Sequence, residues 1–114
     1  MKISQSFTFS AAHLIPGHLT CGVVHGHTFK VETVISGKLD PETGMVMDFH
    51  QLRQILDSIR GQLDHKFLNE VIEVPTAENI CLYIRKKLFR GLEKTGVSLL
   101  RVRVYESSDS YAEY

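Results

Sequence analysis

Apolar and polar residues alternate along three stretches of the chain, and this period of two predicts β-strands. Over residues 3–13, serine and threonine occupy one face, and the other face carries Ile3, Phe7, Phe9, Ala11 and His13. Over residues 27–37, one face carries His27, Phe29, Val31, Thr33 and Ile35. Over residues 98–106, one face carries Leu100, Val102 and Val104. Each strand therefore presents one apolar face to a core.

Two stretches between the second and third strands have apolar residues at helical spacing. Asp48 followed by Gln51 resembles a capping box, Gly61 marks an end, and the inward positions are Phe49, Leu52, Leu56 and Ile59. The second helix begins after Thr76, its expected N-cap, runs toward Gly91 and turns inward Ala77, Ile80, Cys81, Ile84 and Leu88.

A short final strand near Tyr111 completes the predicted order of two strands, two helices and two strands. This order indicates an α+β fold, with an antiparallel sheet and helices on one face. The 114 residues fit one domain, 1–114. Residues 14–24 form a long loop between the first two strands, and long loops in compact domains are often functional.

Composition excludes several classes of protein. Thirteen basic residues balance thirteen acidic ones, whereas proteins that bind nucleic acids or membrane surfaces usually carry a basic excess. No apolar run approaches the roughly 20 residues of a membrane helix, and residues 1–6 lack the apolar core of a signal peptide. Two cysteines are too few for a disulfide scaffold. We therefore expect a cytoplasmic protein that binds neither nucleic acid nor membranes.

Three of the six histidines form a candidate metal site. His25 and His27 are two residues apart, so in a strand both rings point to the same face. If the first two strands pair antiparallel, His13 lies beside them. Three imidazoles suit a catalytic zinc ion with an open fourth position, although such sites also accept iron, cobalt or nickel. The competing interpretation is three unrelated histidines at strand ends.

The two cysteines receive different interpretations. Cys21 lies four residues before His25, in the loop that must fold over the metal. It is a fourth ligand, an acid–base group that a nearby cation keeps as thiolate, or a small buried hydrophobic residue. Cys81 lies on the apolar stripe of the second helix and is expected in the core.

Two acidic positions are further candidates. Asp64 and His65 are adjacent and form an acid–base unit if the carboxylate orients the ring, or else a solvated pair on a loop. Glu106 continues the inward face of the third strand, unless that strand ends at Val104. An inward carboxylate needs a partner, and it can accept two parallel hydrogen bonds from a guanidine-like edge.

Several short strings together resemble the 6-pyruvoyltetrahydropterin synthase family nearly from end to end. They are FSAAH at 9–13, CGVVHGH at 21–27, GMVMDF at 44–49, LDH at 63–65, PTAEN at 75–79 and YE at 105–106. The C-x3-H-G-H spacing is most similar to the 6-carboxy-5,6,7,8-tetrahydropterin synthase branch, which serves queuosine and 7-deazaguanine biosynthesis. The animal-type branch has a longer spacer. A folate-precursor branch carries a glutamate near the cysteine position, and residues 14–27 contain none.

The resemblance implies a tunnelling fold of ββααββ order, assembled into a trimeric barrel or a hexamer. It implies zinc on His13, His25 and His27, and 7,8-dihydroneopterin triphosphate as the substrate. Cys21 and the pair Asp64 and His65 from neighbouring subunits then act as acid–base groups. Glu106, with Thr76, holds the pterin. The products are 6-carboxy-5,6,7,8-tetrahydropterin, acetaldehyde and triphosphate.

Three alternatives stay open from the sequence. The first is the sister activity that eliminates triphosphate alone and yields a pyruvoyl product. The second is a non-catalytic oligomer that zinc stabilises, although structural zinc sites usually have four protein ligands. The third is a generic zinc hydrolase, which does not predict a carboxylate at Glu106. Thr76 also has two interpretations, since an N-cap role explains it as well as contact with a pterin does.

Overall fold

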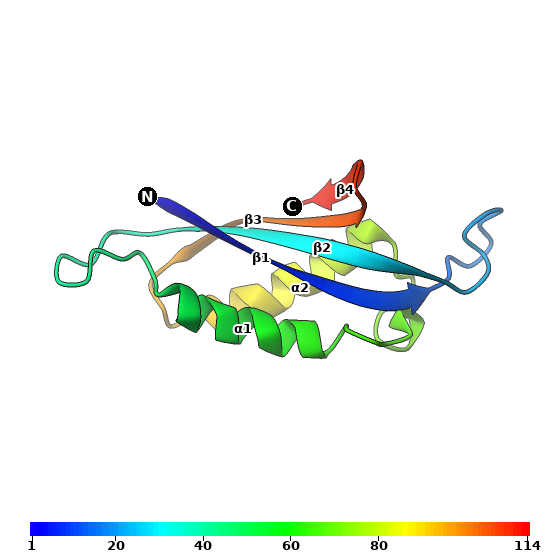
Figure 1. Cartoon of the computed structure of the whole chain (residues 1–114), viewed down its shortest axis with the longest axis horizontal. Helices are drawn as coiled ribbons and strands as arrows, with labels where there is room; N and C mark the ends of the chain where they lie inside the picture. Colours follow the sequence, from blue (N-terminus) through cyan, green and yellow to red (C-terminus); the bar gives the residue numbers. More distant parts are fainter.

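The computed structural model describes residues 1–114 as two layers, a four-stranded sheet and two helices (Figure 1). In chain order, the elements are β1 Lys2–His13, β2 His25–Ser36, α1 Phe49–Gly61, a short 3-10 helix Leu68–Glu70, α2 Ala77–Leu92, β3 Ser98–Ser107 and β4 Ser110–Glu113. The predicted α+β order of ββααββ is confirmed. The second strand begins two residues earlier than its alternation indicated.

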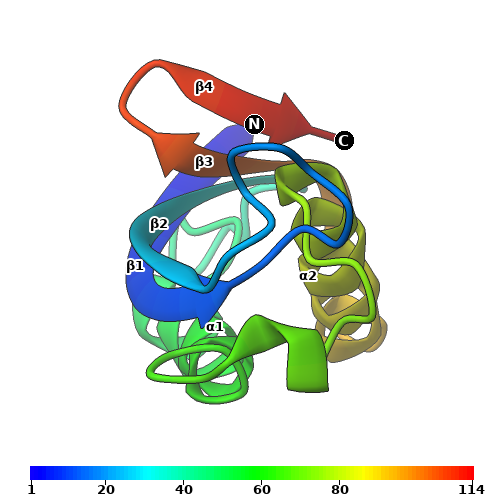
Figure 2. The ribbon, with the colours of Figure 1, turned by 90° about the vertical axis from the view of Figure 1, so that its right-hand side faces the viewer.

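All four strands are antiparallel and lie in the order β1-β2-β3-β4. The first pair is long and regular, from Lys2 opposite Ser36 to His13 opposite His25. Both helices cover the same face of the twisted sheet, as the end-on view in Figure 2 shows. The loops at 14–24 and 37–47 project from opposite ends of a molecule 54 Å long (Figure 1).

The predicted caps begin both helices. The Asp48 side chain accepts the His50 N–H at 2.8 Å, and Thr76 Oγ1 accepts the Asn79 N–H at 3.2 Å. Phe49 was wrongly predicted to face the core, because it is half exposed and the buried stripe of α1 starts only at Leu52. Neither helix has the length and apolar surface that crossing a bilayer requires.

A β-bulge changes which residues of β3 face inward. The register between β2 and β3 shifts between Val34 and Ile35, so that Ile35 lies opposite Leu99. An extra residue in one strand reverses the faces beyond it. Leu100 was therefore wrongly predicted to be inward: it is exposed, and Leu99 packs against the core instead. Val102 and Val104, beyond the bulge, are fully buried as predicted.

The core lies between the sheet and the helices. The sheet contributes fully buried aromatic and β-branched side chains, and the helices contribute leucine, isoleucine and the buried Cys81. At the centre, Phe29 stacks on Phe9 with ring centroids 4.9 Å apart. Phe29 also forms T-shaped pairs with His13 and His27, whose ring centroids lie 5.6 and 5.5 Å away. Phe29 therefore connects the core to the histidines at the end of the sheet.

The free edge of β1 is covered by two side chains of α1 and by main chain that follows this helix. Arg53 donates to the Ser6 carbonyl at 3.0 Å, and Arg60 donates to the Thr8 carbonyl at 2.8 Å. Farther along, the Ala12 N–H donates to the carbonyl of Lys66 at 3.0 Å. These contacts satisfy main-chain groups that an edge strand would otherwise expose.

We predict that Phe29→Ala lowers the free energy of unfolding by about 3–5 kcal/mol, because it removes a fully buried ring from the core. Phe49→Ala is the matched control and should change it by less than about 0.5 kcal/mol, because that ring is half exposed. Urea denaturation of the two variants measures the difference. Equal losses would contradict the assignment of Phe29 to the core.

Candidate metal centre and adjoining pocket

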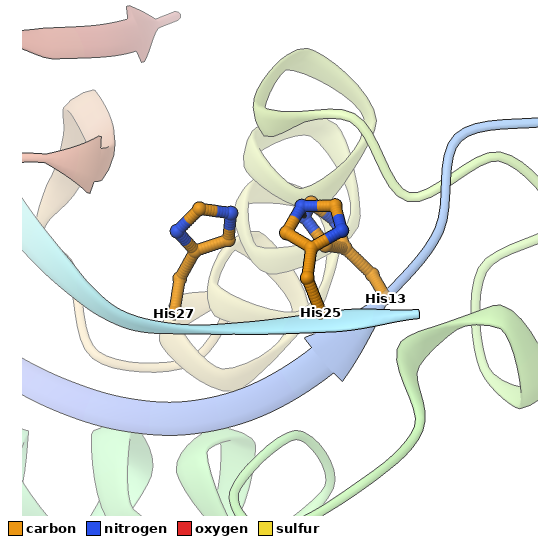
Figure 3. Close-up of side chains that lie close together, drawn as sticks. All are labelled: His13, His25 and His27. Carbon is orange, nitrogen blue, oxygen red and sulfur yellow. Dashed lines mark hydrogen bonds between the residues drawn. The ribbon is translucent and has the colours of Figure 1, made fainter. Parts of the chain in front are cut away.

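Three histidine rings converge at the end of the β1–β2 ribbon (Figure 3). His13 is the last residue of β1 and lies directly opposite His25, the first residue of β2. His27, two residues farther along β2, turns its ring to the same side (Figure 3). One nitrogen from each ring lies within 4.8 Å of the other two. The antiparallel register therefore produces the cluster that the sequence predicted.

Hydrogen bonds set the tautomer of two of these rings. His13 Nδ1 lies 2.8 Å from the Pro75 carbonyl, and His25 Nδ1 lies 2.7 Å from the Val23 carbonyl. A carbonyl only accepts, so both Nδ1 atoms carry the proton and both Nε2 atoms present lone pairs in the neutral rings. These two Nε2 atoms are only 3.1 Å apart. Two facing lone pairs repel, and a shared cation removes that repulsion.

His27 completes the set. Its Nε2 is buried and has no hydrogen-bond partner. Burial lowers the pKa of His27. The negative charge of Glu106 acts against this shift, and positive charge on His13 or His25 would add to it. A neutral imidazole is the form that binds metals. The three histidines are thus positioned to bind a metal ion, and the orphaned nitrogen fits that role.

Glu106 lies at the margin of the cluster. One carboxylate oxygen is 3.7 Å from His27 Nε2, and the other is 4.0 Å from His13 Nε2. Its side chain is about one-third exposed, so the carboxylate faces both the histidines and solvent. The inward face of β3 therefore continues to Glu106.

A pocket of about 310 Å³ adjoins the cluster and collects three of the candidate residues. Cys21 from the 14–24 loop, Thr76 at the start of α2 and Glu106 from β3 all line it. Ser110 and Tyr111 of β4 close another side. Cys21 is not part of the histidine cluster. The structure therefore places Cys21 in the adjoining pocket and not among the three candidate metal ligands.

Asp64 has partners other than His65. One carboxylate oxygen accepts the Ser10 N–H at 2.9 Å, and the other lies 3.0 Å from an Arg60 nitrogen. The Ser10 hydrogen bond, aided by Arg60, lowers the pKa of Asp64 and keeps it ionised. His65 Nε2 is 3.6 Å from the carboxylate, beyond hydrogen-bond distance. Within one chain, Asp64 therefore does not orient the His65 ring by a direct bond.

His65 is held through its main chain and leaves its side chain free. Its φ is +57°, the left-handed conformation that a residue with a Cβ rarely adopts, and its N–H donates to the Ser10 carbonyl at 2.7 Å. The side chain is 83% exposed. Strained backbone that neighbouring contacts impose is often found at functional sites. Here it places an exposed imidazole 3.6 Å from the Asp64 carboxylate.

Cys21 and His65 line separate hollows. His65 borders a second hollow of about 640 Å³, together with Ser10, His27 and Lys66. That hollow and the Cys21 pocket share no lining residue. Because residues alternate across a strand, Ser10 points to the face opposite the buried Phe9. One chain therefore does not bring Cys21 and His65 together.

The family of the chain is established by comparison. The family model described as 6-pyruvoyl tetrahydropterin synthase matches residues 2–114. The chain belongs to this family.

Individual relatives carry several names. A protein of Archaeoglobus fulgidus, provisionally named a 6-carboxy-5,6,7,8-tetrahydropterin synthase, is 53% identical over 99% of this chain and 94% of its own length. A Pyrococcus furiosus protein named dihydroneopterin monophosphate aldolase is 35% identical over 95% of this chain and 91% of its own. A Synechocystis protein named 6-carboxy-5,6,7,8-tetrahydropterin synthase is 41% identical over 98% of this chain and 91% of its own length.

A solved structure shows the same fold. The 6-pyruvoyl tetrahydropterin synthase of Caenorhabditis elegans superposes with a TM-score of 0.90, at 24% identity, over 100% of this chain and 94% of its own. The predicted tunnelling-type α+β fold is thereby confirmed.

Some residues of the site were not predicted from the sequence. Arg60 pairs with Asp64, four residues later in the chain. This spacing of opposite charges, which is typical of ion pairs on helices, was the signal that could have predicted the pair. The carbonyls of Pro75 and Val23 orient two histidines, and main-chain acceptors carry no residue signature. Such outer contacts orient ligand rings and set their tautomers.

We predict that His25→Ala lowers metal affinity by more than about 100-fold, because the lost ring is a ligand and not an outer contact. The control is His50→Ala, an exposed residue on α1. Bound metal per chain is measured after dialysis against a chelator. If the His25 variant retained metal as well as the His50 variant does, the cluster would not be the metal site.

The lowered pKa of Asp64 predicts a component of acid sensitivity. As pH drops, the unfolded chain takes up this proton near the ordinary aspartate pKa of about 3.9, and the folded chain takes it up only at lower pH. The free energy of unfolding therefore falls as pH drops through the pKa of the folded state. In Asp64→Asn this component is absent, and stability should decline less steeply below about pH 4. Urea unfolding between pH 3 and 6 measures the slope. The control is Asp57→Asn, an exposed residue with no partner, which should keep the wild-type slope.

Proposed function

We propose that the protein is a zinc-dependent lyase of queuosine and 7-deazaguanine biosynthesis. It converts 7,8-dihydroneopterin triphosphate to 6-carboxy-5,6,7,8-tetrahydropterin, acetaldehyde and triphosphate. The observation that carries the proposal is the convergence of three imidazoles beside a pocket that contains both a thiol and a carboxylate. The name shared by the relatives at 53% and 41% identity supports this branch of the family. The whole chain, 1–114, serves as one pterin-binding domain.

Glu106 provides the recognition of the pterin. The amino-pyrimidine edge of a pterin presents two adjacent N–H groups, and a carboxylate accepts both in parallel. Glu106 lies on β3 and its side chain is partly buried, so this contact orients the ring in the pocket. Thr76 lines the same pocket. Its oxygen accepts the Asn79 N–H as an N-cap, which leaves the hydroxyl hydrogen for the substrate.

The ligand set of His13, His25 and His27 fits zinc, which supplies Lewis acidity that favours deprotonated hydroxyls of the substrate side chain. Cys21 lies in the adjoining pocket and exchanges a proton with the side-chain carbons as a thiolate–thiol pair. The partner proton carrier is His65. The ionised Asp64 lies 3.6 Å from its Nε2.

A complete site requires a second copy of the chain. Cys21 and His65 line different hollows, and the His65 ring is exposed to solvent. A neighbouring copy that places its His65 beside the Cys21 pocket joins the two groups. We therefore propose a homo-oligomer, a trimer or hexamer, as the active form. The net charge of zero imposes no overall electrostatic barrier to self-association.

Two other activities within the family and one structural role differ from this proposal in what they produce. Elimination of triphosphate alone yields a pyruvoyl product. An aldolase activity, the one named for the Pyrococcus relative, acts on a dihydroneopterin monophosphate. A purely structural zinc site yields no product and is disfavoured by the three-ligand cluster, since structural sites are usually closed by four.

The decisive test is an anaerobic assay of the zinc-loaded oligomer with 7,8-dihydroneopterin triphosphate, with products identified by mass. Acetaldehyde and 6-carboxy-5,6,7,8-tetrahydropterin are expected. A pyruvoyl product would reassign the reaction and keep the site. Substrate left unchanged by a metal-loaded, intact oligomer would overturn the enzymatic proposal.

Two variants separate the proposed roles within this assay. Cys21→Ala should lower kcat by about 100-fold or more and keep zinc, because an acid–base group is lost. Glu106→Gln should mainly raise KM, because one carboxylate acceptor becomes an N–H₂ donor facing the pterin. Zinc loss in the Cys21 variant would instead indicate a ligand. An unchanged KM in the Glu106 variant would remove the pterin contact.

A further inference from the structure

The loop that carries Cys21 is closed by its own hydrogen bonds. The Ile15 N–H donates to the Cys21 carbonyl at 2.7 Å, and the His18 N–H donates to the Ile15 carbonyl at 3.2 Å. Gly22 packs so closely that a Cβ there would lie 2.5 Å from the His18 carbonyl oxygen. The loop is therefore a folded unit in which the segment around His18 sits against the segment around Cys21.

His18 holds this unit through one ring nitrogen. Its Nδ1 lies 3.2 Å from the Thr20 N and 3.0 Å from the Cys21 N. Main-chain N–H groups only donate, so Nδ1 is the acceptor and the ring proton of the neutral imidazole sits on Nε2. The Thr20 hydroxyl lies 3.2 Å from the same nitrogen and 3.7 Å from Cys21 Sγ. The sulfur, the hydroxyl and the ring thus lie together.

This arrangement copies the role of asparagine or aspartate at a turn or helix start. Those side chains accept main-chain N–H groups two and three residues later, through an oxygen two bonds beyond Cβ. His18 Nδ1 occupies the corresponding position, also two bonds from Cβ, and accepts from the same two positions. Both the N–H and the carbonyl of Cys21 are thereby bonded within the loop. These two bonds fix the direction in which the cysteine side chain leaves the backbone.

We infer that His18 is a positioning residue for Cys21. Its unprotonated Nδ1 organises residues 18–21 so that Cys21 lines the pocket that also contains Glu106. His18 itself lines the same pocket. The inference rests on the proposed acid–base role of Cys21 for its effect on turnover. Its structural content, that an acceptor at Nδ1 orders the Cys21 segment, is independent of that role.

The test compares three substitutions in the zinc-loaded oligomer. His18→Asn places an oxygen where Nδ1 was, His18→Gln moves the acceptor one bond farther, and His18→Ala removes it. Leu19→Ala is the matched control, since the Leu19 side chain is fully exposed and makes no hydrogen bond. Hydrogen exchange at the amides of Thr20 and Cys21 measures how well the loop is ordered. The rate of iodoacetamide alkylation of Cys21 measures the accessibility of its thiol, with the buried Cys81 as an internal reference.

His18→Ala should speed amide exchange at Thr20 and Cys21 about tenfold and change the alkylation rate of Cys21, as the loss of a cap does. Its kcat should fall about 10–100-fold with KM within about twofold, because a misplaced group costs rate and not affinity. His18→Asn should restore exchange, alkylation and kcat to within about threefold of wild type. His18→Gln should behave like the alanine variant, and Leu19→Ala like wild type.

Two results would overturn the inference. The first is unchanged amide exchange at Cys21 in His18→Ala. The second is an asparagine variant as impaired as the alanine variant, which would mean that the ring itself contacts substrate. If the wild-type protein does not turn over the pterin, exchange and alkylation still decide the inference. That outcome would count against the proposed function alone.

Discussion

The pairing of His13 with His25 across the β1–β2 ribbon is the contact on which the site depends. The buried stack of Phe9 and Phe29 belongs to the same ribbon, so a slip of one residue would turn both the core and the histidines to solvent. The register that stabilises the fold is thus the register that assembles the ligands. It brings two Nε2 lone pairs to 3.1 Å, a separation that a bound cation stabilises and an empty site does not.

The start of α2 is linked to the same centre. The Pro75 carbonyl holds His13, and the next residue, Thr76, caps α2 and lines the pocket. A proline cannot donate from its nitrogen, but its carbonyl stays available as an acceptor. Helix capping, ligand orientation and pocket lining therefore meet in two consecutive residues. A change that altered the cap would also move the acceptor that sets the tautomer of His13.

The histidine cluster and His65 lie at different places on the ribbon. The cluster lies beside the pocket that contains Cys21 and Glu106. At the free edge of β1, the main chain of Ser10 holds Asp64 and the main chain of His65, and Arg60 pairs with Asp64. The His65 ring is exposed there, 3.6 Å from the Asp64 carboxylate. Such a division is useful only if another surface meets it, which is why the proposed function requires a second copy.

Local pattern was sufficient for much of this molecule. Alternation predicted the strands, helical spacing and caps predicted α1 and α2, and the H-x-H step predicted two metal ligands, because each of these signals lies within a few residues. His13 joined the predicted cluster only through the expected antiparallel pairing of the first two strands. The tertiary structure decided the rest. The bulge that exposes Leu100 depends on how β2 pairs with β3, and the Ser10 N–H that Asp64 accepts lies on β1, 54 residues away. The carbonyl of Pro75 is 62 residues from His13, and only folding brings such distant main-chain groups within hydrogen-bond distance.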